Sequence, residues 1–183
     1  MKEIRTDRLT IRWFDLGDAP FILRLINEPA WLEHIGDKGV NSVQAAEDYL
    51  TTGPIAMYAR YGFGLNLVLL TESQEPIGMC GLLKRDSLED VDLGFAYLEE
   101  FWGQGFGKES VEAMMCYSRK AFHLERVVAI TSPKNTRSER LLNRVGFYFD
   151  REIRLSSDSD QLNLWRREFE NILPVNSESQ TQS

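Results

Sequence analysis

Hydrophobic and polar positions along the chain follow two periods, one of two residues and one of three to four. Short runs that are apolar or alternating predict strands, and they cover residues 9–13, 65–70, 77–83, 90–98, 126–131, 148–155 and 162–168. Apolar side chains at helical spacing predict helices, and they occur after Asp18 and over residues 42–50, 108–122 and 136–145. Strands with helices inserted between them indicate an α/β class with a mixed sheet.

Capping and turn residues refine these boundaries. Asp18 stands where the first helix needs an N-cap, and Thr136 with Glu139 forms a capping-box pattern before the last helix. Gly53-Pro54 is expected to end the second helix, with a short helical piece after it. Residues 31–39 show no clear period and predict an irregular segment.

Composition and charge limit the possible classes of protein. The 183 residues, 43% hydrophobic and 27% charged, fit one globular domain, which we expect over residues 1–173, before a disordered polar tail at residues 174–183. No apolar run reaches the ~18 residues of a membrane span, and no signal peptide is visible. The net charge of −7 argues against a general nucleic-acid binder. Cys80 and Cys116 are expected to be buried reduced thiols, and we expect a cytoplasmic protein, either a monomer or a homodimer.

Residues 92–110 carry the strongest candidate chemistry. This segment predicts a strand, a short turn, a glycine-rich loop and then a helix. Gly103, Gly105 and Gly107 stand directly before the helix, where glycine lets backbone N–H groups converge on one point. Because the N-terminus of a helix adds the positive end of its dipole, the expected ligand is a phosphate or pyrophosphate.

Two common phosphate-binding motifs do not fit this loop. A P-loop requires Gly-x4-Gly-Lys-Ser/Thr, but Trp102 stands at its first glycine and Glu109 at its Ser/Thr. The hydroxyl that binds Mg²⁺ is therefore missing, and a carboxylate would lie near the phosphates. The dinucleotide fingerprint requires Gly-x-Gly-x-x-Gly, whereas the spacing here is Gly-x-Gly-x-Gly. A nucleotide-binding protein is disfavoured, and a plain glycine turn remains the alternative for the loop alone.

The strand and loop together resemble the acetyl-coenzyme A motif of the GNAT superfamily of N-acetyltransferases, Gln/Arg-x-x-Gly-x-Gly/Ala. Gly105 and Gly107 match its small positions, and Trp102 replaces its usual Gln or Arg. This replacement resembles the ribosomal-protein-alanine acetyltransferase-like (RimJ/RimL-like) branch. Further segments resemble that branch in the same order, and they are Thr6–Trp13, Asp18-Ala19, Ile77-Gly78, Gly81-Leu82, Asn135–Ser138, Leu141-Leu142 and Gly146-Phe147.

The resemblance implies a GNAT acyl-CoA N-acyltransferase fold, with a central mixed β-sheet flanked by helices, and acetyl-CoA as cosubstrate without a metal. Backbone amides of the loop would hold the pyrophosphate, and a strand edge would pair with the pantetheine arm. The residues implied to bind the coenzyme are Phe95, Ala96, Tyr97, Trp102, Gly103, Gln104, Gly105, Phe106, Gly107, Lys108 and Asn135. The side chains of Gln104 and Lys108 are simply solvated in the alternative interpretation, and Asn135 is equally suited to cap a helix.

Acetyl transfer to an amine requires a base for the amine and an acid for the leaving thiolate. Asp92 stands where relatives often carry Glu, and it is the candidate base, acting through a water; the alternative is an exposed acid at the strand entry. The family's usual acid, a Tyr, is replaced by Leu142. Ser138 is the candidate to hydrogen-bond the sulfur, against the alternative of an ordinary polar residue in a first helical turn. Tyr97 and Tyr148 are fallback candidates without positional support, and catalysis mainly by proximity is a further alternative.

The resemblance implies that the acceptor contacts the first two helices and the late hairpin. The candidates are Trp31, His34 and Tyr61, with Tyr58 and Phe63 nearby in the sequence. A lone His in a loop is more often a surface or packing residue, so this alternative stays open for His34. The sequence therefore indicates an acetyl-CoA-dependent N-acetyltransferase that acts on a protein N-terminal α-amine or a small-molecule amine. The alternative is a non-catalytic module that binds or senses acyl-CoA.

Overall fold

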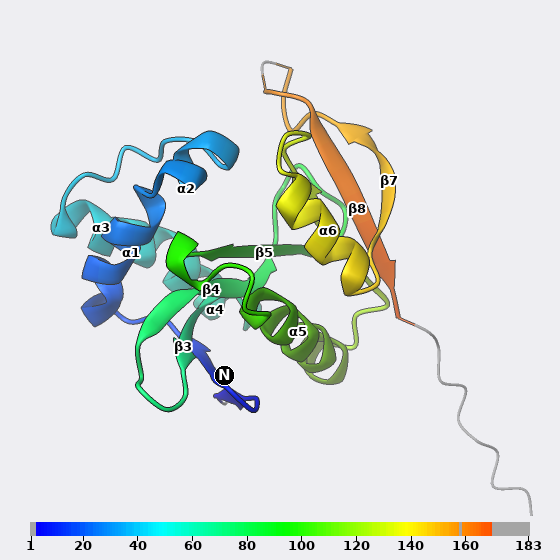
Figure 1. Ribbon diagram of the computed structural model, residues 1–183. Coiled ribbons are helices and arrows are strands. Elements are labelled where there is room, and N and C mark those ends of the chain that lie inside the picture. Colours follow the sequence, from blue (N-terminus) through cyan, green and yellow to red (C-terminus); the bar gives the residue numbers. More distant parts are fainter. Residues whose placement is uncertain (1–2, 158, 170–183) are drawn as a thin grey trace, which may run out of the picture.

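A single β-sheet organises the chain (Figure 1). The computed structural model describes residues 3–157 and 159–169, so the tail expected at residues 174–183 lies outside the described residues. Within them the sheet has eight strands in the spatial order β1-β2-β3-β4-β5-β6-β8-β7. The strands are β1 (Ile4–Arg5), β2 (Leu9–Trp13), β3 (Leu65–Leu70), β4 (Pro76–Leu83), β5 (Asp92–Tyr97), β6 (Arg126–Thr131), β7 (Tyr148–Ile153) and β8 (Leu162–Glu168). All neighbours are antiparallel except β5 and β6, so the predicted mixed α/β fold is confirmed.

Helices cover both faces of this sheet. They are α1 (Ala19–Ile26), α2 (Pro29–His34), α3 (Val43–Leu50), α4 (Ala56–Tyr61), α5 (Phe106–Phe122) and α6 (Thr136–Arg144), with short turns at Leu16–Asp18, Thr51–Ile55 and Glu99–Phe101. Figure 1 shows α1, α2 and α3 grouped on one side of the molecule, and α6 beside β8 on the other. None of the helices in the described residues is long and apolar enough to cross a membrane.

Alternation along β3 sends side chains into two hydrophobic cores. Successive side chains of a strand point to opposite faces of the sheet, so Leu67 packs with α1 and α3 while Val68 packs with α5. Both side chains are almost fully buried, at 1% and 0% exposed, and such burial stabilises the fold by roughly 1.5–3 kcal/mol for each side chain. The central strands are therefore held on both faces, which fixes where α5 begins relative to β5.

β5 and β6 pair at one point and then diverge. Asp92 lies opposite Val128, and the N–H of Val128 donates to the carbonyl of Val91 over 3.0 Å. No further β5–β6 pair occurs among the described residues, whereas β5 is paired with β4 along its whole length. The edge of β5 from Leu93 to Tyr97 is therefore left without a neighbouring strand.

Two helical segments differ from the predictions. Residues 31–39 are not wholly irregular, because Pro29 begins the short helix α2, and proline is favoured at a first helical position. Gly53-Pro54 does not end the second helix, because a π-helical turn over Thr51–Ile55 carries the chain from α3 into α4. The wider turn accommodates the missing N–H of proline without stopping the helix.

Of the two capping predictions, one is wrong and the other holds in position only. The N-cap of α6 is Asn135, whose Oδ1 accepts the N–H of Ser138 over 3.0 Å, so the capping box does not start at Thr136. Asp18 is the N-cap residue of α1, as predicted, but its side chain does not cap the helix. Its two carboxylate oxygens instead accept hydrogen bonds from Arg12, each at 2.8 Å.

Candidate functional site

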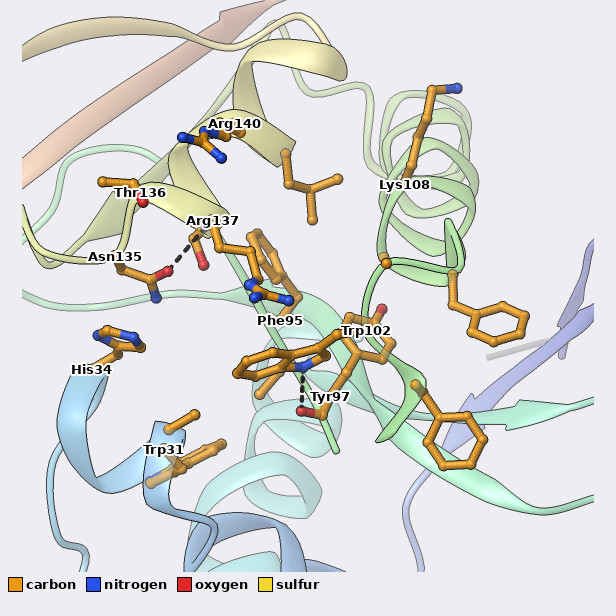
Figure 2. A pocket seen from close by; sticks show the side chains of 18 of the residues that line it. Trp31, His34, Phe95, Tyr97, Trp102, Lys108, Asn135, Thr136, Arg137 and Arg140 are labelled. Carbon is orange, nitrogen blue, oxygen red and sulfur yellow. Dashed lines mark hydrogen bonds between the residues drawn. The ribbon is translucent and has the colours of Figure 1, made fainter. Parts of the chain in front are cut away.

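A cavity of about 600 Å³ opens where β5 and β6 diverge (Figure 2). Its walls are the end of α1, α2, the edge of β5, the glycine loop before α5, and one face of α6. Figure 2 shows Trp31 and His34 of α2 on one side of the opening, Asn135 and Arg137 at the start of α6 on another, and Trp102 beside them. The volume lies within the usual range of small-molecule and cofactor sites.

The glycine loop leaves the start of α5 uncapped. Gly103 and Gly105 have φ of 76° and 86°, a left-handed conformation that glycine adopts without strain. Gly105 is the N-cap residue, and no side chain in the described part of the chain caps this helix end. The first helical bond runs from the N–H of Glu109 to the carbonyl of Gly105 over 3.1 Å, so the amides of residues 106–108 have no partner within the helix. Free amides at the positive end of a 17-residue helix are suited to receive an anion.

Gly107 lets three elements approach one another closely. A Cβ added there would lie 3.0 Å from Cδ2 of Leu141 in α6 and 3.6 Å from the Tyr97 ring of β5. The Tyr97 hydroxyl is hydrogen-bonded to the Ser110 hydroxyl, which itself donates to the carbonyl of Gly107 over 3.1 Å. Burial raises the pKa of Tyr97 well above its ordinary value. Tyr97 therefore fixes the first turn of α5 to β5.

The open edge of β5 offers backbone groups to the cavity. Backbone groups of a strand point alternately to its two neighbours. The carbonyl of Val91 points toward β6, and so does that of Tyr97, which accepts a 2.9 Å hydrogen bond from Nε1 of Trp102. Phe95 is separated from Val91 and from Tyr97 by an even number of residues, so its backbone groups point the same way. Its N–H and C=O, together with the N–H of Tyr97, therefore lie on the edge that β6 leaves open. An extended amide-rich ligand is suited to pair there as an added strand.

α6 supplies a row of cations opposite the start of α5. Arg137, Arg140 and Arg144 line the cavity at helical spacing, with Lys134 before them. Arg137 lies beside Trp102 in Figure 2, and its Cζ is 4.2 Å from the ring centroid. In the described part of the chain Arg140 and Arg144 have no ion-pair partner. The sequence analysis missed this row, although its i, i+3, i+7 spacing was a readable signal.

The wall formed by α1 and α2 has a different character. Trp31 is 7% exposed, and neither its indole N–H nor Nδ1 of His34 has a hydrogen-bond partner within the described residues. Glu28, which the sequence analysis did not select, carries the only carboxylate among the described residues that line the cavity. Its Oε1 lies 3.9 Å from Nε of Arg24, and its side chain is 21% exposed. This wall is the one suited to a cationic or amine group.

The structure brings most of the predicted site residues to the cavity. Ser138 lies in the first turn of α6 beside Asn135, which both lines the cavity and caps the helix. Of the three predicted strand residues, Ala96 directs its backbone toward β4 and only its neighbours face the open edge. The predicted residues that line the cavity are Trp31, His34, Phe95, Ala96, Tyr97, Trp102, Gly103, Gly105, Phe106, Gly107, Lys108, Asn135 and Ser138.

Three predicted residues do not line the cavity. The Gln104 amide nitrogen donates to the carbonyl of Glu100 over 3.0 Å. Tyr61 stacks on Phe63, with ring centroids 5.7 Å apart, at the end of α4. Asp92 is 1% exposed, and its Oδ2 accepts a 2.6 Å hydrogen bond from Nε of Arg85. Burial raises the pKa of Asp92 to about 6 despite the lowering effect of the guanidinium.

Tyr58 does not line the cavity either. Tyr58 is buried, stacked on Trp13 at 4.3 Å, and bonded to the backbone of Phe14 and Leu65, so its role is structural. No group of three or more His, Cys, Asp or Glu side chains among the described residues is arranged to hold a metal ion.

Comparisons with known proteins agree with this geometry. A family profile described as an acetyltransferase (GNAT) domain matches residues 8–148. The uncharacterized N-acetyltransferase p20 of Bacillus licheniformis is 28% identical over 149 residues, which is 80% of this chain and 83% of that protein. The crystal structure of an acetyltransferase from Agrobacterium tumefaciens C58 has a TM-score of 0.78 and 23% identity, covering 92% of this chain and 95% of that one. RimL, a ribosomal L7/L12 alpha-N-protein acetyltransferase in complex with coenzyme A, has a TM-score of 0.77 and 21% identity, covering 91% and 98%. At these identities the two structures show a shared fold.

Proposed function

The chain belongs to the acetyltransferase (GNAT) domain family, and we propose that it moves an acetyl group from acetyl-CoA to a primary amine. The acceptor is a protein N-terminal α-amine or a small-molecule amine, which attacks the thioester directly. One observation carries this proposal: the uncapped start of α5 opens onto the cavity at the place where β5 and β6 diverge.

The groups that line the cavity fit the chemistry of acetyl-CoA. A diphosphate needs donors and positive charge, which the amides of residues 106–108 and the cations Arg137, Arg140 and Arg144 offer. The pantetheine arm carries two amides, which fit the unpaired backbone groups of Phe95 and Tyr97 on the open edge of β5. This fit supports the cosubstrate that the sequence indicates.

The acceptor amine enters on the wall formed by α1 and α2. There the carboxylate of Glu28 offers a negative charge to an ammonium group, and Trp31 supplies an apolar surface. The amine must lose a proton before attack, which costs about 1 kcal/mol for an α-amine and about 4–5 kcal/mol for a lysine-like amine at pH 7. An α-amine therefore needs far less help from a base. RimL, described as a ribosomal L7/L12 alpha-N-protein acetyltransferase, supports the same acceptor class.

The reaction balances with the residues at hand. The amine nitrogen forms a bond to the thioester carbonyl carbon, the C–S bond breaks, one amine proton leaves, and the sulfur takes up a proton. Ser138 is proposed to hydrogen-bond the sulfur, because its side chain lies on α6 within the cavity lining. The role of Asp92 as base stays a prediction, since its carboxylate lies outside that lining. The cytoplasmic location and the state of assembly also stay predictions.

Release of coenzyme A in the presence of candidate amines tests the proposal. The prediction that Cys116 is buried is wrong: its side chain is exposed on α5 and would itself react with a thiol reagent. The assay therefore uses Cys116→Ser or follows the acetylated product by mass. We expect turnover with short peptides that have free N-termini and none when the N-terminus is blocked. At 100 times the dissociation constant, acetyl-CoA should raise the melting temperature by roughly 5–10 °C, and ATP or NAD should not. Binding without turnover on any amine would indicate the non-catalytic alternative, and no binding would overturn the proposal.

A further inference from the structure

We propose that Arg8 is a positioning residue that neutralises Glu109 and thereby lets the glycine loop receive the coenzyme diphosphate. This inference rests on the proposed function, because it concerns the same anion site. It explains why a carboxylate is tolerated at the position where a P-loop carries Ser or Thr. It also gives a role to the Thr6–Trp13 segment, which the proposed reaction leaves without one.

Arg8 and Thr6 together contact both oxygens of the Glu109 carboxylate. The guanidinium of Arg8 reaches Oε2 with Nε at 2.8 Å and Nη2 at 2.6 Å, and the backbone N–H of Arg8 donates to Oε1 over 3.0 Å. The hydroxyl of Thr6 donates to the same Oε1 over 2.6 Å. Four contacts thus join a segment just before β2 to the first turn of α5, about a hundred residues later in the chain.

The same guanidinium also holds the glycine loop. Nη1 of Arg8 donates to the carbonyl of Gln104 over 3.0 Å, and Cζ lies 4.5 Å from the ring centroid of Phe106. Nη2 lies 3.3 Å from where a Cβ on Gly105 would be. Arg8 is not among the residues that line the cavity. It therefore contacts the loop from behind and acts on a bound diphosphate through the loop and through Glu109.

Charge at the helix start makes this neutralisation necessary. Burial would raise the pKa of Glu109, but the hydrogen bonds from Thr6 and Arg8 outweigh it and hold the pKa below its ordinary value. The carboxylate is therefore ionised at neutral pH, one turn from the free amides of residues 106–108. Without Arg8 its charge would compete with the diphosphate for the positive end of α5.

A double-mutant cycle tests the proposal, with calorimetric binding of coenzyme A and steady-state kinetics as readouts. We expect Arg8→Met to raise Kd and the KM for acetyl-CoA by about tenfold, with kcat within about twofold. Glu109→Gln alone should change Kd by less than about threefold. In the double variant Glu109→Gln should recover at least about threefold of the affinity that Arg8→Met loses, because the charge to be neutralised is gone.

Arg5→Met is the matched control, because Arg5 pairs with Glu3 on the surface, with a side chain that is 70% exposed. It should bind coenzyme A as the wild-type protein does. Should Arg8→Met fail to fold, Arg8→Lys is used, because lysine keeps the positive charge but lacks the several N–H donors of the guanidinium. It should raise the Kd for coenzyme A by about threefold.

An Arg8→Met protein that binds within twofold of wild type, or a double variant as weak as Arg8→Met, would overturn the inference. If the wild-type protein itself does not bind coenzyme A, the proposed function fails instead.

Discussion

Asp92 provides a prediction whose magnitude can be worked out from the structure. Its side chain is 1% exposed, Oδ2 is paired with Arg85, and Oδ1 has no hydrogen-bond partner within the described residues. Burial raises the pKa of Asp92 from 3.8 to about 6, with Arg85 opposing the shift. A difference of about 2 pKa units corresponds to roughly 3 kcal/mol between folded and unfolded states.

The sign follows from proton binding. Between pH 4 and 6 the folded protein binds a proton at Asp92 more readily than the unfolded chain does, so this group makes the fold less stable as pH rises. By pH 7 the loss is nearly complete. The variant Asp92→Asn cannot titrate, so its stability relative to wild type should rise by roughly 2.4 kcal/mol between pH 4 and pH 7. Taking this difference cancels the contributions of the other titrating groups.

Urea denaturation of both proteins across this range measures the effect. A difference in unfolding free energy that is constant with pH, or that falls as pH rises, would refute the reasoning about burial. The same two proteins, assayed for pH dependence of kcat/KM, test the predicted base. If Asp92 is the base, a limb near pH 6 disappears in the Asn variant; an unchanged profile assigns the base elsewhere.

Three further changes test the two ends of the cavity. Gly105→Glu adds a side chain at φ 86° and a negative charge at the uncapped start of α5, so calorimetry should show at least a roughly 30-fold loss of acetyl-CoA affinity; unchanged affinity would misplace the site. Arg140→Met combined with Arg144→Met should weaken coenzyme A binding by about tenfold and reduce its salt dependence, measured at two salt concentrations, whereas an unchanged salt slope would separate these cations from the phosphates. Glu28→Gln should raise the amine KM by about tenfold in initial-rate assays while leaving the acetyl-CoA Kd unchanged; the reverse pattern would place the amine elsewhere.

Much of the architecture was predictable because it depends on local periodicity. β3 and β4 are short apolar runs between turn residues, and α5 repeats apolar residues at helical spacing, so their core faces follow from the sequence. The uncapped start of α5 was predictable from local sequence as well, since Gly103 and Gly105 directly precede the helix. α2 was missed because six residues are too few to show a period.

The remaining features depend on which surfaces meet. Arg140 and Arg144 could be placed on one face of a helix from their spacing, but the sequence does not tell that this face turns toward α5. In the sequence, Glu28 looks like an ordinary acid at a helix end. Its importance follows only from the structure, because no other carboxylate of the described residues lines the cavity. The contact between Arg8 and Glu109 joins residues 101 positions apart, and its geometry arises only when β2 and α5 pack on one sheet.

Hydrogen exchange followed by mass spectrometry tests the central claim most directly, because it reports which amides acetyl-CoA contacts. The account predicts that acetyl-CoA slows exchange in peptides covering residues 103–109 and the open edge at Phe95–Tyr97, and leaves β7 unchanged. If saturating acetyl-CoA leaves exchange at the start of α5 unaltered, or protects only other elements, the account is contradicted.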